Sequence, residues 1–137
     1  DGTSEVIRLI PSLDAAIVIN SVVTGMDRRF VRDSVKIGLL DSALQAPLAG
    51  FGDVDLYPLD HQRLGILCSR VVLNHPFLDG NKRTGFLLML EAAQMNGVEL
   101  EFANQNVAAD QVLALAAGEL EEDAFCEWLV GCIGDEP

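Results

Sequence analysis

Hydrophobic and polar residues recur with a helical period along most of this chain. From Pro58 to Asn74, five apolar residues form one stripe of an amphipathic helix, at positions i, i+3, i+4, i+7 and i+8; they are Leu64, Leu67, Cys68, Val71 and Val72. Residues 84–96 are apolar nearly all round, as expected of a central buried helix that ends at Asn96 and Gly97. The pattern therefore predicts two long helices with a short connection between them.

Other segments add outer helices and a break. The first outer helix is expected to begin after Ser12, a residue that commonly caps helices, and to end at Gly25. Residues 46–58 contain two prolines and two glycines and so predict a loop or hairpin. The alternation in residues 98–102 predicts a short strand. In all, four further segments have the pattern of helices: 11–23, 32–45, 107–117 and 121–133.

Length and composition point to one domain away from membranes. The chain has 137 residues, enough to bury a core, so residues 1–137 are expected to form a single domain. No apolar run approaches the ~18 residues that span a bilayer, and no basic segment leads into an apolar one as in a secretory signal. We therefore expect a cytoplasmic protein. Cys68, Cys126 and Cys132 form no CxxC pair, which favours free thiols over a disulfide or zinc framework.

The formal net charge is −12, and the charge is unevenly distributed. Residues 1–83 hold ten acidic and all nine basic residues, whereas residues 84–137 hold eleven acidic residues and no basic one. Such a chain would repel a phosphate backbone, so direct binding to nucleic acid is not expected. The acidic half has the composition of a solubilising surface; a docking face for a basic partner is the alternative.

The connection between the two long helices is polar. Residues 75–83 read HPFLDGNKR and lie at the predicted N-terminus of the buried helix. A helix N-terminus has unpaired N–H groups and the positive end of the helix dipole, and Lys82 and Arg83 add two cations there. These features favour an anion with several charges, such as the phosphates of a nucleotide.

The remaining polar residues of the stretch complete a catalytic interpretation. Asp79 is unexpected beside an anion unless a divalent metal bridges its carboxylate and the phosphates. Gly80 permits close approach of the backbone or a positive φ, and Asn81 can cap the helix or bond back to its own loop. His75 can accept a proton from an attacking hydroxyl. Together they describe a site for a nucleoside triphosphate with magnesium and a general base.

Each of these residues has a more common structural interpretation when it occurs alone. An asparagine is more often a simple cap, Asp-Gly more often a turn, and neighbouring cations more often a solvated face. A lone histidine is more often a structural hydrogen-bonding group, and His61 keeps this interpretation because it has no comparable neighbours. The functional interpretation depends on all the residues occurring together within nine positions.

The stretch HPFLDGNKR resembles the motif of the Fic/Doc superfamily, which reads HPFxxGNGR in the Fic branch and HxFxxxNKR in the Doc branch. The segment GLLDSALQAP, the loop after it and the Asn-Gly pair that ends the central helix also resemble a Doc-type protein. The resemblance implies an all-α fold, a compact bundle of about six helices with a short flap hairpin or loop before the two motif helices.

The resemblance also assigns roles. His75 would be the general base for the target hydroxyl, Phe77 would be buried and hold the loop, and Asp79 would hold Mg2+. The loop at residues 47–57 would be a flap that pins a target segment by strand-like pairing. Four consecutive residues would bind the phosphates of ATP: Gly80, Asn81, Lys82 and Arg83.

Two positions favour the Doc type of chemistry. Fic proteins have glycine at the position of Lys82 and usually a second arginine at the position of Phe86, and they transfer AMP. The Doc pattern implies a nucleotide turned round, so that the γ-phosphate faces the base and is transferred. Pro76 and Gly80 match the Fic motif, so AMP transfer is the alternative.

The resemblance implies a biological setting as well. It predicts the toxin of a toxin-antitoxin module that phosphorylates a target protein, with translation elongation factor Tu as the candidate. Many Fic proteins carry a self-inhibitory Ser or Thr four residues before a Glu that precedes Gly or Asn; this sequence does not, which favours a separate antitoxin. The other hypothesis is a helical module that binds phosphate without transfer. His75 and Asp79 favour the enzyme, because binding alone needs neither a base nor a metal ligand.

Overall fold

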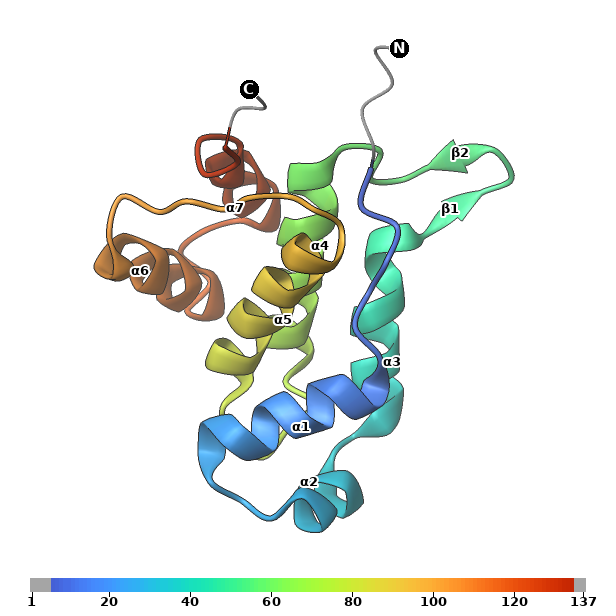
Figure 1. Cartoon of the computed structure of the whole chain (residues 1–137), viewed down its shortest axis with the longest axis vertical. Coiled ribbons are helices and arrows are strands. Elements are labelled where there is room, and N and C mark those ends of the chain that lie inside the picture. Colours follow the sequence, from blue (N-terminus) through green and yellow to red (C-terminus); the bar gives the residue numbers. More distant parts are fainter. Residues whose placement is uncertain (1–5, 135–137) are drawn as a thin grey trace.

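The structure is a computed structural model that describes residues 6–134. A short 3-10 helix, Ala46–Leu48, leads into a hairpin of two strands, β1 Gly50–Phe51 and β2 Val54–Asp55. The predicted all-α class is confirmed. Within the described residues there are seven α-helices (Figure 1): α1 Leu13–Thr24, α2 Arg28–Ser34, α3 Ile37–Gln45, α4 Asp60–Asn74, α5 Asn81–Met95, α6 Gln105–Ala116 and α7 Glu122–Val130.

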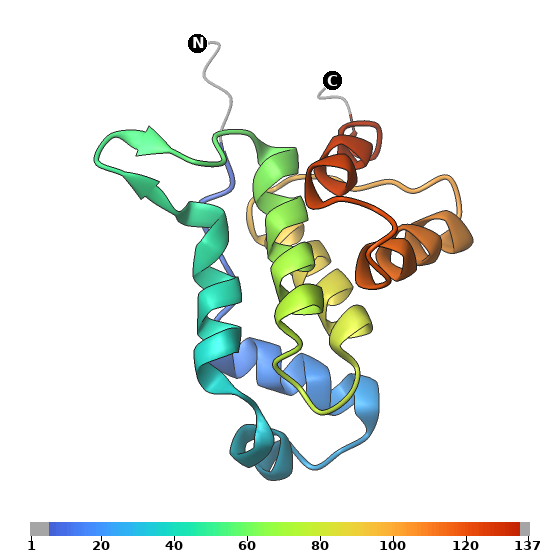
Figure 2. The ribbon, with the colours of Figure 1, turned by 180° about the vertical axis from the view of Figure 1, so that it is seen from behind.

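The two long helices predicted at the centre form the core. α4 and α5 run antiparallel and pack against each other, with α3 and α7 beside α4 and with α1 across α5 (Figures 1 and 2). All five residues of the predicted apolar stripe on α4 are buried. Gly85 permits the close approach of the two helices, because a Cβ atom there would lie only 3.0 Å from the carbonyl oxygen of Cys68. The two closely packed helices, α4 and α5, therefore hold the short connection between them.

The segment predicted as one helix at residues 32–45 is two helices. α2 begins upstream at Arg28 and ends before Val35, which is buried and has an extended backbone with φ −65° and ψ 140°. The backbone N–H of Lys36 donates to the carbonyl oxygen of Pro76 at 2.9 Å and not to a carbonyl of its own helix. The regular apolar spacing thus comes from two short helices joined at a buried valine.

The strand predicted at residues 98–102 is wrong. The structure has only an isolated bridge there, between Leu100 and Ile133. Val98, Leu100 and Phe102 pack against the core, and exposed glutamates alternate with them. The alternation therefore reflects an extended connection that lies on the helices, without a neighbouring strand among residues 6–134 to pair with.

The hairpin predicted within residues 46–58 is confirmed. Its pairs are Gly50 with Asp55 and Phe51 with Val54, and all four residues are exposed. Arg63 fixes its base: the buried guanidinium donates to the carbonyl oxygen of Tyr57 at 2.6 Å and lies 3.1 Å from the carboxylate of Asp55. Arg63 is thus a structural cation.

A partly buried ion pair ties α7 to α4. The Nε atom of Arg70 lies 2.9 Å from Oε2 of Glu122, and Ser69 donates a hydrogen bond to the same carboxylate. Burial by itself raises the pKa of Glu122. The hydrogen bonds from Arg70 and Ser69 and the charge of Arg70 outweigh this effect and hold the pKa below its ordinary value.

Glu122→Gln should therefore destabilise the protein more at neutral pH than in acid. A carboxyl whose pKa is lowered by folding stabilises the folded state above its unfolded pKa of about 4.3. This contribution disappears as the pH falls through the lower folded pKa. Urea midpoints of wild type and variant should differ clearly at about pH 7, and the difference should be smaller at a pH below the unfolded pKa of about 4.3. An equal difference at both pH values would contradict a role for the charge. Glu119→Gln, at an exposed position, is the control.

The three cysteines lie inside the protein. Cys68, Cys126 and Cys132 are buried and free, as predicted, and burial raises the pKa of the Cys68 and Cys126 thiols.

No helix among residues 6–134 combines the length and apolar composition that membrane crossing requires.

Candidate active site

The residues that join α4 to α5 contain the predicted base; we call residues 75–80 the motif loop. His75 follows α4 in the left-handed conformation, with φ 53° and ψ 54°, and is the one non-glycine residue with positive φ among residues 6–134. For a residue with a Cβ atom this conformation costs about 1–2 kcal/mol. Pro76 follows at once and cannot continue the helix. Backbone strain at the predicted base is typical of a functional site.

Hydrogen bonds within the loop and from the α2–α3 junction hold its shape. The side-chain amide of Asn81 accepts from the N–H of Phe77 and donates to its carbonyl oxygen, both at 2.9 Å. Phe77 is buried, as predicted. The carbonyl oxygen of Pro76 accepts from Lys36, as described above. Of the two roles predicted for Asn81, bonding back to its own loop is the one observed, so its side chain is occupied within the loop and only its backbone N–H is left unpaired.

A buried asparagine of another helix completes the support. The Nδ2 atom of Asn20, in α1, donates to the carbonyl oxygen of Asp79 at 2.8 Å and to the hydroxyl of Thr84 at 3.0 Å. Gly80 has a φ of 76°, and a Cβ atom there would lie 2.8 Å from Cγ2 of Thr24. Gly80 is therefore required both by its backbone conformation and by its contact with α1.

Asn20→Ala should destabilise the fold by about 1–3 kcal/mol, because it leaves the part-buried carbonyl oxygen of Asp79 and the buried hydroxyl of Thr84 without their donor. The measurement is urea denaturation of the purified protein. Asn106→Ala, at an exposed position on α6, should leave the stability nearly unchanged. If Asn20→Ala were as stable as wild type, the bonds from α1 would not hold the motif loop.

The first turn of α5 has the features of the predicted anion site. The first bond of the helix runs from the N–H of Thr84 to the carbonyl oxygen of Gly80 at 2.8 Å. The N–H groups of Asn81, Lys82 and Arg83 therefore have no acceptor within residues 6–134. The side chains of Lys82 and Arg83 are exposed, and neither forms an ion pair in the part of the chain that is described. Unpaired donors and unpaired cations lie together here.

His75 and Asp79 are exposed, and both lie in the motif loop just before this turn. The Oδ1 atom of Asp79 accepts from the N–H of Gly80 at 2.8 Å, which leaves Oδ2 available to a cation. His75 makes no side-chain hydrogen bond to any residue of the described chain, so both ring nitrogens can face a substrate. No three His, Cys, Asp or Glu side chains among residues 6–134 gather as a metal site. A single carboxylate suits Mg2+, which commonly binds through one or two carboxylates together with waters and phosphates.

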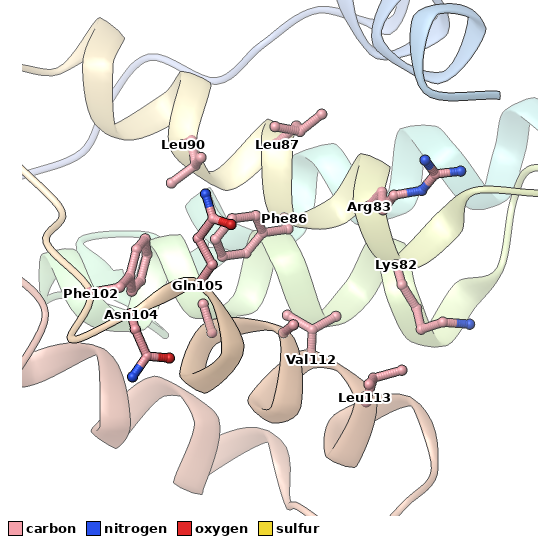
Figure 3. Close-up of a pocket in the computed structure, with 12 residues that line it drawn as sticks. Lys82, Arg83, Phe86, Leu87, Leu90, Phe102, Asn104, Gln105, Val112 and Leu113 are labelled. Carbon is pink, nitrogen blue, oxygen red and sulfur yellow. The ribbon is translucent and has the colours of Figure 1, made fainter. Parts of the chain in front are cut away.

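An apolar groove begins at the two cations and follows α5 (Figure 3). Its volume is about 850 Å³. One face of α5 opens on this groove, so the helix is not buried all round as predicted; Leu87 is 38% exposed. Its lining includes Lys82 and Arg83 at one end, with Phe86 and Leu90 of α5, Phe102, and Val112 and Leu113 of α6 along it.

The hairpin within residues 47–57, predicted as a flap that pins a target segment, lies at the other end of α4 from the motif loop. The hairpin precedes the N-terminal end of α4, whereas the motif loop follows the C-terminal end (Figure 2). The 15 residues of α4 separate the two by about 22 Å. The α2–α3 junction does lie beside the motif loop, because the N–H of Lys36 donates to the carbonyl oxygen of Pro76.

His61 lies away from this site. It is in the first turn of α4, and its Nε2 atom is 4.0 Å from the carboxylate of Glu127 in α7. The structural interpretation given to it from the sequence agrees with this position.

Comparison with known proteins agrees with the motif. Residues 11–93 match the Fic/DOC family. A curated relative, Toxin Doc of Mycolicibacterium smegmatis, is 33% identical over 96 residues, which cover 69% of this chain and 73% of the relative. No solved structure matches the chain. The family match extends from the start of α1 into α5, so it includes both the motif loop and the helix that supports it.

Proposed function

Because this chain belongs to the Fic/Doc family, we propose that it is the toxin of a toxin-antitoxin module and transfers the γ-phosphate of ATP to a serine or threonine hydroxyl of a target protein. The observation that carries the proposal is an exposed, strained His75 on the short motif loop that leads directly into the unpaired N–H groups and cations of α5. The relative from Mycolicibacterium smegmatis is named a toxin, which supports the biological setting.

In the proposed step, an unprotonated ring nitrogen of His75 accepts the proton of the target hydroxyl. The hydroxyl oxygen forms a bond to the γ-phosphorus, and the bond from that phosphorus to the oxygen that bridges to the β-phosphate breaks. ADP leaves with that bridging oxygen. Lys82, Arg83 and the free N–H groups of α5 bind the phosphate oxygens and stabilise their charge in the transition state. Asn20, Asn81 and the α2–α3 junction hold the motif loop so that these groups are positioned in advance.

Asp79 is the residue in this site that fits Mg2+, because one of its carboxylate oxygens is free. A bound Mg2+ ion would neutralise phosphate charge between the carboxylate and the nucleotide. Without a cation, Asp79 would repel the phosphates that the neighbouring turn attracts. This carboxylate beside an anion site is thus consistent with ATP as a magnesium complex.

The presence of Lys82 favours transfer of the γ-phosphate over transfer of AMP. A glycine at this position leaves room for a phosphate against the backbone, whereas a lysine fills that room and adds a charge beside it. Gly80 and Pro76, which match the Fic motif, are the observations that keep AMP transfer as the second candidate. A non-catalytic phosphate-binding module is the third candidate, and the strained, exposed His75 is an argument against it.

Two partners belong to this proposal. The first is the target protein, for which elongation factor Tu is the candidate. The second is a separate antitoxin, and the apolar groove beside Lys82 and Arg83 is large enough to receive part of it. A partner in this groove would lie next to the phosphate-binding turn and so could block it.

A paired labelling assay tests the reaction. The purified chain is added to a cell lysate with ATP labelled either at the γ-phosphate or at the α-phosphate, and labelled proteins are separated by electrophoresis. Label from the γ-phosphate alone would agree with phosphate transfer, and label from the α-phosphate would show AMP transfer. No label from either nucleotide, with ATP binding intact, would favour the non-catalytic module.

A further inference from the structure

The unpaired basic side chains of this acidic protein are concentrated at the end that holds the motif loop. Two of the nine basic residues are used internally: Arg63 at the hairpin and Arg70 with Glu122. Six of the other seven lie in residues 27–36 and 79–83, where there are only three acidic residues. The rest of the chain has eighteen acidic residues against three basic ones. These two segments are therefore positive, and the remainder of the chain is strongly negative.

Four of these cations lie outside the phosphate-binding turn. They belong to α2 and the α2–α3 junction, and we call them the basic end: Arg28, Arg29, Arg32 and Lys36. All four are exposed, and none forms an ion pair within residues 6–134. Asp27 and Asp33 lie in the same segment, but the Asp27 carboxylate caps α2 by accepting from the N–H groups of Arg29 and Phe30.

The basic end lies beside the motif loop. α2 and the α4–α5 connection occupy the same end of the molecule in both views (Figures 1 and 2), and the N–H of Lys36 donates to the carbonyl oxygen of Pro76, the residue after His75. α2 also carries Phe30, which is 50% exposed between the arginines. Arginine with an exposed aromatic ring is the composition that protein interfaces enrich.

We infer that the basic end is the docking surface for an acidic segment of the target protein, which it holds next to His75. The inference rests on the proposed function, because it names the chemistry of the substrate that the same site would modify. The acidic remainder of this chain repels an acidic protein, so the field favours its approach to the basic residues. The unpaired arginines lose no internal partner when they bind.

The size of the basic end favours a protein segment over nucleic acid. The seven residues of α2 extend about 10 Å along the helix axis. A duplex carries one negative charge per about 1.7 Å and would continue beyond this surface onto the acidic remainder of the molecule. A short acidic segment of a protein can match the patch without that penalty.

The binding test uses the full chain without ATP, so its result does not depend on whether phosphate is transferred. The probe is a short fluorescent peptide of alternating glutamate and serine, and its affinity is measured by fluorescence anisotropy at low salt. The variant combines Arg28→Gln, Arg29→Gln and Arg32→Gln. The matched control combines Gln94→Glu, Ala117→Glu and Ala124→Glu, which lowers the net charge equally at exposed positions on other elements.

We expect the arginine variant to bind the peptide at least about tenfold more weakly than wild type, a loss of about 1.4 kcal/mol. The control should remain within about twofold, and salt should weaken wild-type binding strongly. Equal affinity of wild type and arginine variant would overturn the proposal. Tighter binding of a single-stranded RNA of the same charge would overturn it in favour of nucleic acid.

The link to the substrate is tested by labelling the lysate with the same three proteins. Label on lysate proteins should fall in the arginine variant and persist in the control, while ATP binding stays constant in both. Loss of peptide binding with unchanged labelling would show that the surface does not serve the substrate. Absence of label with wild type itself would overturn the phosphate transfer, and the peptide result alone would then decide the docking surface.

Discussion

His75→Asn and His75→Ala should both lower phosphate transfer by about 10²–10⁴-fold, the range that general-base catalysis contributes. The base acts on the attacking hydroxyl and has no role in binding the phosphates, so ATP affinity should stay within a few-fold of wild type. Initial rates of transfer from γ-labelled ATP and the dissociation constant of ATP, measured on the same preparations, separate the two effects.

The two substitutions differ in what they do to the backbone. His75 has a φ of 53°, a conformation that asparagine tolerates well and alanine less well. His75→Asn should therefore keep the stability of the wild type, whereas His75→Ala should be destabilised by about 1 kcal/mol. His61→Ala, in the first turn of α4 and away from the motif loop, is the control and should transfer phosphate normally. Turnover near the wild-type rate in a well-folded His75→Asn protein would show that His75 is not the base.

The centre of this fold was predictable because its sequence pattern is determined by packing alone. The stripe on α4 is apolar because every one of its members is buried. The end of α5 was predictable for a similar reason, since Gly97 has a φ of 71° that few other residues adopt. Local rules of this kind need no information about distant parts of the chain.

The wrong predictions depend on tertiary contacts. The break at Val35 has no proline or glycine to mark it; it exists because Lys36 donates to the motif loop, about forty residues away along the chain. The hairpin was predicted correctly as a local structure. Its distance from His75 follows from the length of α4, and the motif contains no information about that distance.

The motif presents the residues proposed for the site, but it does not present the contacts that support them. The proposed base, carboxylate and cations occur in one contiguous stretch. Asn20 belongs to no motif, so its role was not predicted from the sequence. Its place among Ile17, Ile19 and Val23 was a signal, because a buried amide needs hydrogen-bond partners. Its two partners, at Asp79 and Thr84, are visible only in the folded chain.

Lys82→Gly should lower transfer of the γ-phosphate by roughly 10²-fold, because it removes a cation that acts on the developing charge of the transferred group. Lys82→Ala should show the same loss, since it also removes the charge. The two variants differ in the turn they leave: only glycine gives the loop HPFLDGNGR, whose backbone N–H groups could accept a phosphate directly.

The orientation of the nucleotide is then decided by the label that each protein transfers. If Lys82 determines that orientation, wild type transfers only γ-label, Lys82→Ala transfers little of either, and Lys82→Gly gains a weak transfer of α-label. The gain should be weak because Phe86 stands where Fic proteins usually have a second arginine, and its ring packs against Phe102 with centroids 5.4 Å apart. Transfer of α-label by wild type would contradict the role of Lys82, because a chain with the lysine in place would then present the α-phosphate to His75.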